Sequence, residues 1–294
     1  MVRELFDDDM FADEAPPPPT PRPPRRRSPL RGETARRIII AIPWIAFAIA
    51  ITAIGGMPFA LAMIVIGGVC LREYMVMVRP LHPVDWAAYI VVAALVLAAY
   101  FGTAFNVLMI LAASFPVLFA LGADRKHRNG VTTSIAVTLL GIVWIGVPLV
   151  HAVLLRDLPD HGAGLFIDVL VGTFAADTGA YATGRMFGTH KIAPTLSPNK
   201  TLEGLVGGFF IGMMAFWFAG LYQDWLTGFD ALAIGAAVAL VAPLGDLFES
   251  MIKRDLGVKD TGRIFGPHGG LLDRLDALLF TMVVAYYLAV QLVY

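Results

Sequence analysis

The stretch from residue 231 to residue 252 reads ALAIGAAVALVAPLGDLFESMI and decides the fold class. At about 1.5 Å per residue, a helix of this length crosses the ~30 Å hydrocarbon core of a bilayer. Similar apolar runs recur along almost the whole chain, which is 57% apolar and only 15% charged. Soluble domains contain about a quarter charged residues, so the composition predicts a helical integral membrane protein.

The length criterion picks out about nine spanning segments, which predict an all-α polytopic fold. They cover residues 38–55, 57–72, 84–102, 104–121, 131–155, 165–184, 204–222, 231–252 and 272–293. We expect the first five, within residues 38–160, to form an N-terminal transmembrane region. The last four, within residues 161–294, are expected to carry the site. No internal repeat is visible, which disfavours a transporter built from two inverted halves.

Residues 1–37 form a separate polar arm. An acidic stretch runs into Pro16–Pro19, and a basic stretch follows from Arg22 to Arg37. So few apolar side chains cannot offset the entropy lost on ordering, so we expect a disordered arm with polyproline II character. The arm has no apolar centre and does not read as a cleavable signal peptide. Its basic half could rest on anionic lipids, but a tail that only fixes orientation is the simpler interpretation.

The Lys and Arg residues predict the orientation of the chain. When the 22 of them are placed on nine helices, all but Arg156 fall in the arm or in the loops that follow the even-numbered helices. Positive residues concentrate on the cytoplasmic side of a membrane protein. The amino terminus and the even-numbered loops are therefore expected in the cytoplasm.

Asp246 is an acid inside a predicted spanning helix, about 10 Å from the basic end of that helix. A carboxylate there costs several kcal/mol unless it is paired or binds a cation, which makes it a functional candidate. Polar side chains at i+3, i+4, i+7 and i+8 share its helix face, and they are Glu249, Ser250, Lys253 and Arg254. The alternative is a salt-bridge ladder that only holds helices together, although buried ion pairs seldom offset their desolvation.

Two more carboxylates, Asp273 and Asp276, begin the last predicted helix, with Arg274 between them. This helix and the preceding one run in opposite directions, so Asp273 and Asp246 are expected at the same level. Converging carboxylates beside cations fit Mg²⁺, which is typically held by one or two carboxylates, phosphate oxygens and water. Helix capping is an alternative for Asp273, but it leaves Asp246 unexplained.

The segment between these helices reads KDTGRIFGPHGG at residues 259–270 and is rich in glycine. Its backbone amides can approach a ligand closely, and the cations Lys259 and Arg263 suit an anion such as a nucleotide polyphosphate. Taken alone, such a segment is more often only a turn. His268 is left open as a proton donor, a phosphate contact or an ordinary loop residue.

A second group of polar residues surrounds the preceding loop. Asp177, Tyr181 and Arg185 share one helix face, and SPNKTLEG follows at residues 197–204. Within that stretch a cation and a hydroxyl are available to a phosphate or a ribose. Other polar residues are interpreted as orientation signals or packing partners, namely Arg72, Glu73, His151 and Asp168. The single cysteine, Cys70, excludes an internal disulfide.

With these residues in view, the carboxyl-terminal third closely resembles the phosphatidate cytidylyltransferase family. The family signature joins Ser-x-apolar-Lys-Arg to Lys-Asp, then to His-Gly-Gly and Asp-Arg-x-Asp. The sequence agrees with it at Ser250–Arg254, Lys259–Asp260, His268–Gly270 and Asp273–Asp276. The segments around Asp177 and residues 197–204 also look like those of the family.

The resemblance implies a Mg²⁺-dependent nucleotidyltransferase of phospholipid biosynthesis that joins CTP and phosphatidic acid, giving CDP-diacylglycerol and pyrophosphate. Carried over by motif, Asp246 and Asp273 would hold the metal. The catalytic residues would be Asp246, Asp273, Lys253, Arg254 and His268. The substrate-binding residues would be Asp177, Ser197, Asn199, Lys200, Thr201, Glu203, Lys259, Arg263, Arg274 and Asp276. A second metal ion or a monovalent cation is left open.

The resemblance also implies a bacterial-type inner (cytoplasmic) membrane, with the site facing the cytoplasm. CTP, phosphatidic acid and membrane lipids are the expected partners, nucleic acid is not, and a homodimer is left open. Two other functions compete with this one. The first is another lipid-phosphate transferase, for instance one acting on a polyprenyl phosphate. The second is a cation transporter that uses Asp246 and Asp177, against which the loop cations argue. Acyl-chain preference and any general base stay open.

Overall fold

The computed structural model describes residues 30–123, 130–262 and 269–294. Every regular element in these ranges is helical, and the strand-like pairing within them is limited to one isolated bridge between Lys191 and Thr201. Most of the predicted arm lies outside the described residues. The first helix already begins at Leu30, ahead of the predicted start at residue 38.

The helices follow the order of the predicted segments. Their bounds are α1 Leu30–Ile54, α2 Gly56–Met77, η1 Arg79–Leu81, α3 Asp85–Phe101, α4 Ala104–Ala123, α5 Val131–Gly141, η2 Ile142–Gly146, α6 Val147–Arg156, α7 Gly162–Phe187, α8 Leu202–Gly220, α9 Gly228–Asp255 and α10 Leu272–Leu292. The chain divides into two compact units, residues 1–46 and 47–294. The second unit contains helices from both predicted transmembrane regions, and the description below concerns this unit alone.

Seven helices in the described part of the chain are long and apolar enough to cross a membrane. They are Gly56–Met77, Ala104–Gly122, Val131–Arg156, Gly162–Phe187, Leu202–Gly220, Gly228–Asp255 and Leu272–Leu292. Two shorter apolar helices, Ile42–Ile54 and Asp85–Phe101, accompany them. The prediction of an all-helical polytopic membrane protein is confirmed, whereas a count of nine spans depends on these two shorter helices.

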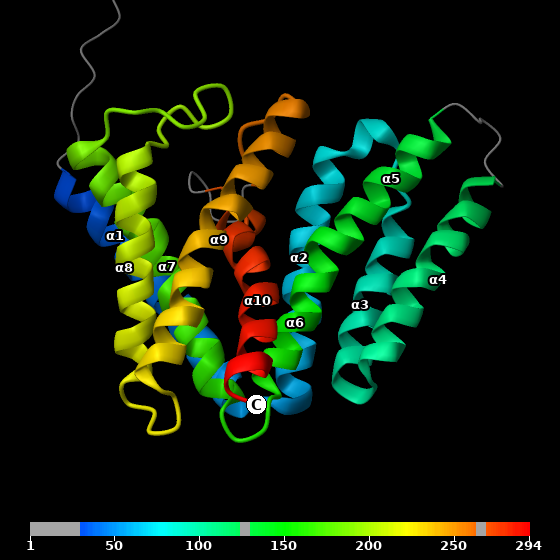
Figure 1. Cartoon of the computed structure of the whole chain (residues 1–294). Coiled ribbons are helices and arrows are strands. Elements are labelled where there is room, and N and C mark those ends of the chain that lie inside the picture. Colours follow the sequence, from blue (N-terminus) through cyan, green and yellow to red (C-terminus); the bar gives the residue numbers. More distant parts are fainter. Residues whose placement is uncertain (1–29, 124–129, 263–268) are drawn as a thin grey trace, which may run out of the picture. The chain divides into compact units, whose positions relative to one another are not determined.

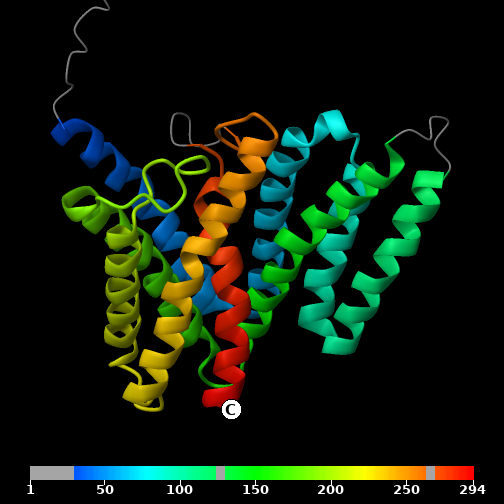
Figure 2. The same cartoon turned by 45° about the horizontal axis from the view of Figure 1, so that its top comes forward.

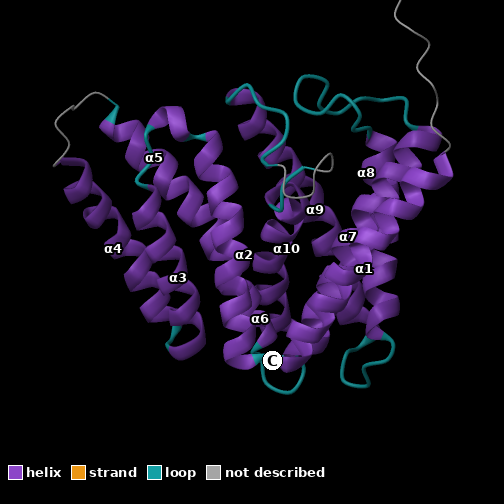
Figure 3. Ribbon diagram, turned by 180° about the vertical axis from the view of Figure 1, so that it is seen from behind, coloured by secondary structure: helices purple, strands orange, loops and turns teal. Residues whose placement is uncertain are grey.

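Within residues 47–294, α9 and α10 lie next to each other, with α7 and α8 on one side of them (Figure 1). Helix α2 and the α5–α6 rod lie on the other side, and α3 and α4 follow beyond these (Figures 1 and 3). The loop between α7 and α8, the end of α9 and the start of α10 lie at the same end of the helices (Figure 2). The fold therefore gathers at one end the segments in which the sequence placed most candidate site residues.

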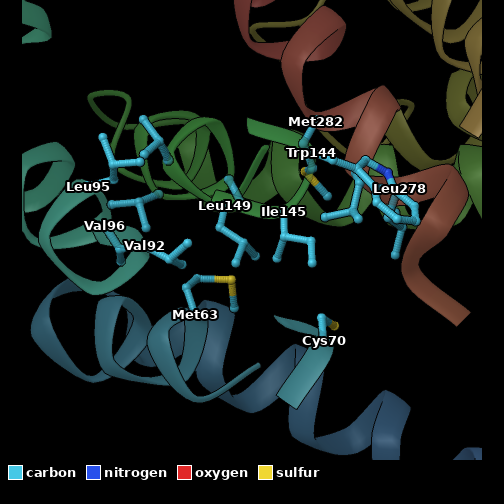
Figure 4. Packing of buried hydrophobic residues seen from close by; sticks show 14 of the residues in the cluster. Met63, Cys70, Val92, Leu95, Val96, Trp144, Ile145, Leu149, Leu278 and Met282 are labelled. Atoms are coloured by element: carbon cyan, nitrogen blue, oxygen red, sulfur yellow. The ribbon is translucent and has the colours of Figure 1, made fainter. Parts of the chain in front are cut away.

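The rod formed by residues 131–156 contains a π-helical turn at Ile142–Gly146. Pro148 has no N–H to donate to the carbonyl group four residues earlier, that of Trp144, which fits a change of helical pitch here. The Trp144 ring is buried and contacts the rings of Tyr74 on α2 and Phe248 on α9, at centroid distances of 5.8 and 5.1 Å. Figure 4 shows it near side chains of α10. The π-turn thus places a large ring where three helices meet.

Glycines let α7 and α8 pack backbone against backbone. On α8, Gly204, Gly208 and Gly212 recur every four residues, a spacing that is common where membrane helices approach closely. A Cβ atom at Gly208 would lie 2.7 Å from the carbonyl oxygen of Ala176 on α7. No side chain fits between the two helices, so their backbones are in direct contact. This close packing fixes the positions of the two ends of the loop that joins them.

Candidate functional site

Three carboxylates from α9 and α10 converge in what we call the acid cluster, Asp246, Glu249 and Asp276. One oxygen of each lies within 4.8 Å of the other two. Glu249 and Asp276 are 1% and 7% exposed, and Glu249 Oε1 has no hydrogen-bond partner among the described residues. Acidic oxygens this close repel one another unless a proton or a cation lies among them. An all-oxygen donor set with one unpartnered buried oxygen fits a hard divalent cation such as Mg²⁺.

Gly245 explains how the two helices bring these carboxylates together. A Cβ atom at this position would lie 2.3 Å from the carbonyl oxygen of Asp276 and 2.9 Å from the Cα of Ala277. Any larger residue would therefore push α9 and α10 apart. Because Gly245 immediately precedes Asp246, this crossing sets the distance between Asp246 and Asp276.

Asp273 has both carboxylate oxygens engaged in other contacts. Its Oδ1 accepts from Lys253 Nζ at 2.7 Å. Its Oδ2 accepts from the backbone N–H of Thr261 at 3.0 Å, from the Thr261 hydroxyl at 2.9 Å and from the Gly270 N–H at 2.7 Å. Asp273 thus connects both ends of the glycine-rich segment, at Thr261 and at Gly270, to the start of α10.

Lys253 joins Asp273 to the acid cluster. Its ammonium group lies 2.7 Å from Glu249 Oε2 and 2.7 Å from Asp273 Oδ1, and its side chain is only 14% exposed. The salt-bridge ladder considered as the alternative from the sequence is therefore present in part, with Glu249 one turn and Lys253 two turns of α9 beyond Asp246. A lysine held between two carboxylates can still contribute positive charge to the site, because it carries three donors.

The assignment of a metal ion to Asp246 and Asp273 stays a prediction. The structure places Asp246 in the acid cluster, and its partners there are Glu249 and Asp276 rather than Asp273. On sequence grounds Asp276 was expected to bind substrate, and Glu249 was expected only to share the face of Asp246. A second acid follows each predicted ligand by three residues: Glu249 follows Asp246, and Asp276 follows Asp273. This spacing is the sequence signal that could have identified Glu249 and Asp276.

Lys200 brings the loop between α7 and α8 over the acid cluster. Its ammonium group lies 2.9 Å from Asp246 Oδ2 and donates to the Pro243 carbonyl oxygen at 3.2 Å. The ends of the loop are paired by the bridge between Lys191 and Thr201. Lys200 is therefore the direct contact of this loop with the acid cluster.

Other residues predicted in this loop fix its shape. Glu203 accepts hydrogen bonds from the Thr189 N–H and hydroxyl and from His190, and the Thr201 hydroxyl accepts from the Gly204 N–H at the start of α8. Ser197 is half-buried and Asn199 is exposed, in the turn before Lys200. Arg254 Nε donates to the Leu196 carbonyl oxygen at 3.3 Å, so the end of α9 also holds the loop.

Asp177 stands on α7 with its side chain exposed, although it lies well inside a spanning helix. It is close enough to Asp246 and Lys200 to interact with both electrostatically. On the next turns of α7, Arg185 Nη1 donates to the Tyr181 hydroxyl at 2.9 Å. An ionisable residue at this depth in a spanning helix is a candidate functional residue.

The remaining predicted cations are placed as follows. Lys259, Arg254 and Arg274 are exposed at the same end of the helices. Arg263 and His268 lie outside the described residues, so their predicted roles stay predictions.

Glu73, interpreted above only as an orientation signal or packing partner, reaches this site from α2. It is 6% exposed, and its carboxylate accepts from the N–H groups of Leu271 and Leu272 at 3.0 and 2.8 Å. No local sequence signal links Glu73 to these residues. An acid in an apolar segment was the one available hint.

Asp168 and Arg156 lie at the other end of the bundle, away from the acid cluster. Asp168 is fully buried and accepts from Gln223 Nε2. Arg156 Nε donates to the Thr52 carbonyl oxygen at 3.1 Å, close to the end of α1 at Ile54. The interpretation of Asp168 as an orientation signal or packing partner stays a prediction, since its Oδ1 has no hydrogen-bond partner among the described residues. Arg156, the one cation outside the predicted cytoplasmic loops, satisfies a carbonyl group at the end of α1.

The sequence is similar to known proteins over most of its length. The family model described as "Cytidylyltransferase family" matches residues 35–292. A protein of Mycobacterium bovis named phosphatidate cytidylyltransferase is 40% identical over 128 residues, 44% of this chain and 42% of its own length. Proteins with the same name from Thermotoga maritima and Haemophilus influenzae are 38% identical over 181 residues and 43% identical over 127 residues.

These two alignments cover 58% and 41% of this chain. The matches span 64% of the Thermotoga protein and 43% of the Haemophilus protein. The chain thus spans less than two-thirds of the length of each of these curated relatives.

Proposed function

The chain belongs to the cytidylyltransferase family, and we propose that it transfers the cytidylyl group of CTP to phosphatidic acid. The products are CDP-diacylglycerol and pyrophosphate. One observation carries the proposal: a largely buried acid cluster with an unpartnered oxygen, contacted by Lys200 at Asp246 and by Lys253 at Glu249. The names of the curated relatives support the choice of CTP and phosphatidic acid.

We further propose that Asp246, Glu249 and Asp276 hold Mg²⁺. Carboxylate oxygens are the donors that Mg²⁺ prefers, and it usually completes its shell with water and substrate phosphates. When bound, the ion supplies positive charge to the phosphate oxygens of CTP. Asp246 is the most exposed of the three, so it is the ligand nearest to an entering nucleotide.

The chemistry asks the protein mainly to position two phosphates. A phosphate oxygen of phosphatidic acid attacks the α-phosphorus of CTP, the bond from that phosphorus to the β-phosphate bridging oxygen breaks, and this oxygen leaves with pyrophosphate. The attacking oxygen is already ionised, so no side chain has to remove a proton from it. Lys200, Arg254, Lys259 and Arg274 surround the acid cluster or lie at its end of the helices, where they can align and neutralise phosphates.

We propose nine spans, including the two shorter apolar helices, with the amino terminus and the site on the cytoplasmic side of a bacterial cytoplasmic membrane. The loops at the end that carries the site hold Lys191, Lys200 and Lys259, whereas the loop at residues 221–227 has no Lys or Arg. Cytoplasmic loops carry the excess of positive residues, which supports this orientation.

Single cysteines test the orientation, because the native Cys70 is buried. In intact cells, Asp224→Cys in the loop at residues 221–227 is expected to react with a membrane-impermeant maleimide. Lys191→Cys, also exposed but at the other end, is expected to react only after the membrane is permeabilised. The reverse labelling pattern would invert the proposed topology.

The activity itself is tested with purified protein in detergent, labelled CTP, phosphatidic acid and Mg²⁺. We expect a lipid-soluble cytidine product that forms only when phosphatidic acid is present. A product with polyprenyl phosphate instead would favour the other transferase, and cation flux in liposomes without nucleotide binding would favour a transporter. Either result would overturn the proposal.

A further inference from the structure

The start of α10 is capped by a residue from a distant helix. The N-cap residue is Leu271, whose side chain cannot accept a hydrogen bond, and the structure records no side-chain cap from α10 itself. Glu73 on α2 supplies the acceptor instead, with Oε1 bound to the Leu271 N–H and Oε2 to the Leu272 N–H. An anionic acceptor at a helix N-terminus satisfies free N–H groups and interacts favourably with the helix dipole.

Two glycines leave room for the Glu73 carboxylate beside the main chain. A Cβ atom at Gly262 would lie 2.4 Å from Glu73 Oε1, and one at Gly270 would lie 2.4 Å from Oε2. The main chain on both sides of residues 263–268 therefore approaches the same carboxylate. This close approach gives two glycines of the segment a role other than the approach to a ligand or a simple turn.

Glu73 is also linked to the acid cluster by a series of polar contacts. Its Oε2 accepts from the Thr261 hydroxyl at 3.4 Å, and that hydroxyl also lies 2.9 Å from Asp273 Oδ2. Asp273 contacts Lys253, and Lys253 contacts Glu249. A shift of the Glu73 carboxylate would therefore displace Asp273 and Lys253 and, through them, Glu249 of the acid cluster.

We infer that Glu73 is a positioning residue for the reaction: it fixes the start of α10 and so holds Asp273 and Asp276 in place. The inference rests on the proposed function for its effect on turnover, but not for the cap. Within the described residues no cation pairs with Glu73, so the buried carboxylate is compensated by these backbone and hydroxyl donors. A residue used only for packing would need no charge at this place, since buried charges are costly to desolvate.

Glu73→Gln is the informative variant, because the amide has the same shape but turns an NH₂ group towards N–H donors. Hydrogen–deuterium exchange of the purified full chain is followed at the amides of Leu271 and Leu272. The matched control is Asp168→Asn, another neutralised buried acid, at the other end of the bundle. We expect exchange at these two amides to rise by about tenfold or more in Glu73→Gln and to stay at the wild-type rate in the control.

Turnover is measured on the same preparations, together with thermal stability. We expect kcat of Glu73→Gln to fall about a hundredfold while the KM for CTP changes less than about threefold, because the variant disturbs alignment more than nucleotide binding. Glu73→Asp keeps the charge and is expected to recover part of the lost turnover. The control is expected to keep wild-type turnover even where its thermal stability falls equally.

Unchanged exchange at Leu271 and Leu272 in Glu73→Gln would overturn the cap and the inference with it. Faster exchange with turnover equal to that of the Asp168→Asn control would overturn the positioning role. If the wild-type protein has no transferase activity, the proposed function is wrong, but the cap by Glu73 is not thereby excluded. The exchange rates would then decide by themselves whether Glu73 holds the start of α10.

Discussion

Asp276→Asn is expected to lower kcat/KM for CTP at least about a thousandfold, as is Asp246→Asn, because each removes a charged oxygen from the proposed metal site. A thousandfold loss corresponds to about 4 kcal/mol of transition-state stabilisation. Metal affinity gives the more direct measurement. Titration with Mn²⁺, followed by electron paramagnetic resonance, is expected to show at least about tenfold weaker binding in both variants.

Asp273→Asn separates the two assignments of the metal ligands. Its oxygens bind Lys253, Thr261 and Gly270, so we expect turnover to fall while Mn²⁺ affinity stays within about threefold of the wild type. The exposed Asp224→Asn, in the loop at the other end of the helices, is the control for loss of one acidic charge. Loss of Mn²⁺ binding in Asp273→Asn with normal binding in Asp276→Asn would restore the pair Asp246 and Asp273.

Gly245→Ala is expected to reduce turnover at least about a hundredfold, although it adds only one methyl group. The new Cβ would lie 2.3 Å from the Asp276 carbonyl oxygen, a backbone atom that can move only if α10 moves. Overpacking of this kind typically costs about 1–3 kcal/mol, so a fall in the melting temperature is expected as well. The activity assay and a thermal melt in the same detergent check both effects.

Gly68→Ala is the matched control, because a Cβ at Gly68 on α2 would meet nothing within 4 Å. Alanine favours a helix over glycine by about 1 kcal/mol, so this variant should be as stable as the wild type or slightly more stable. If Gly245→Ala keeps normal turnover and stability, the close crossing of α9 and α10 does not set the geometry of the acid cluster.

The helices and the region of the site could be predicted from the sequence because both depend on local patterns. Apolar length predicts a spanning helix, and a single acid inside one marks a candidate position, as with Asp246, which the structure places beside two other carboxylates. The i, i+4 relation also anticipates the contact between Glu249 and Lys253. These inferences need no knowledge of how one helix is rotated against another.

The choice between Asp273 and Asp276 does need that knowledge. The two residues are three positions apart on α10, and both meet side chains of α9: Asp273 contacts Lys253, and Asp276 lies beside Asp246 and Glu249. Only the rotation and depth of α10 decide which of them joins the acid cluster. Those are set by the crossing at Gly245 and by the cap from Glu73, whose partners are 198 and 199 residues away in the sequence. Contacts at such separations leave no periodic signal in a single sequence.

The distance between Glu73 and its partners has a consequence for the biogenesis of the protein. At about 5–20 residues per second, a ribosome makes Leu271 roughly 10–40 s after Glu73. During that interval α2 carries a carboxylate that has none of its final donors, in a segment destined for the bilayer. The Glu73 carboxylate is therefore made long before the backbone N–H groups of α10 that compensate it. A chain truncated before α10 would leave the Glu73 carboxylate without these two backbone donors, which is costly in a membrane-spanning segment.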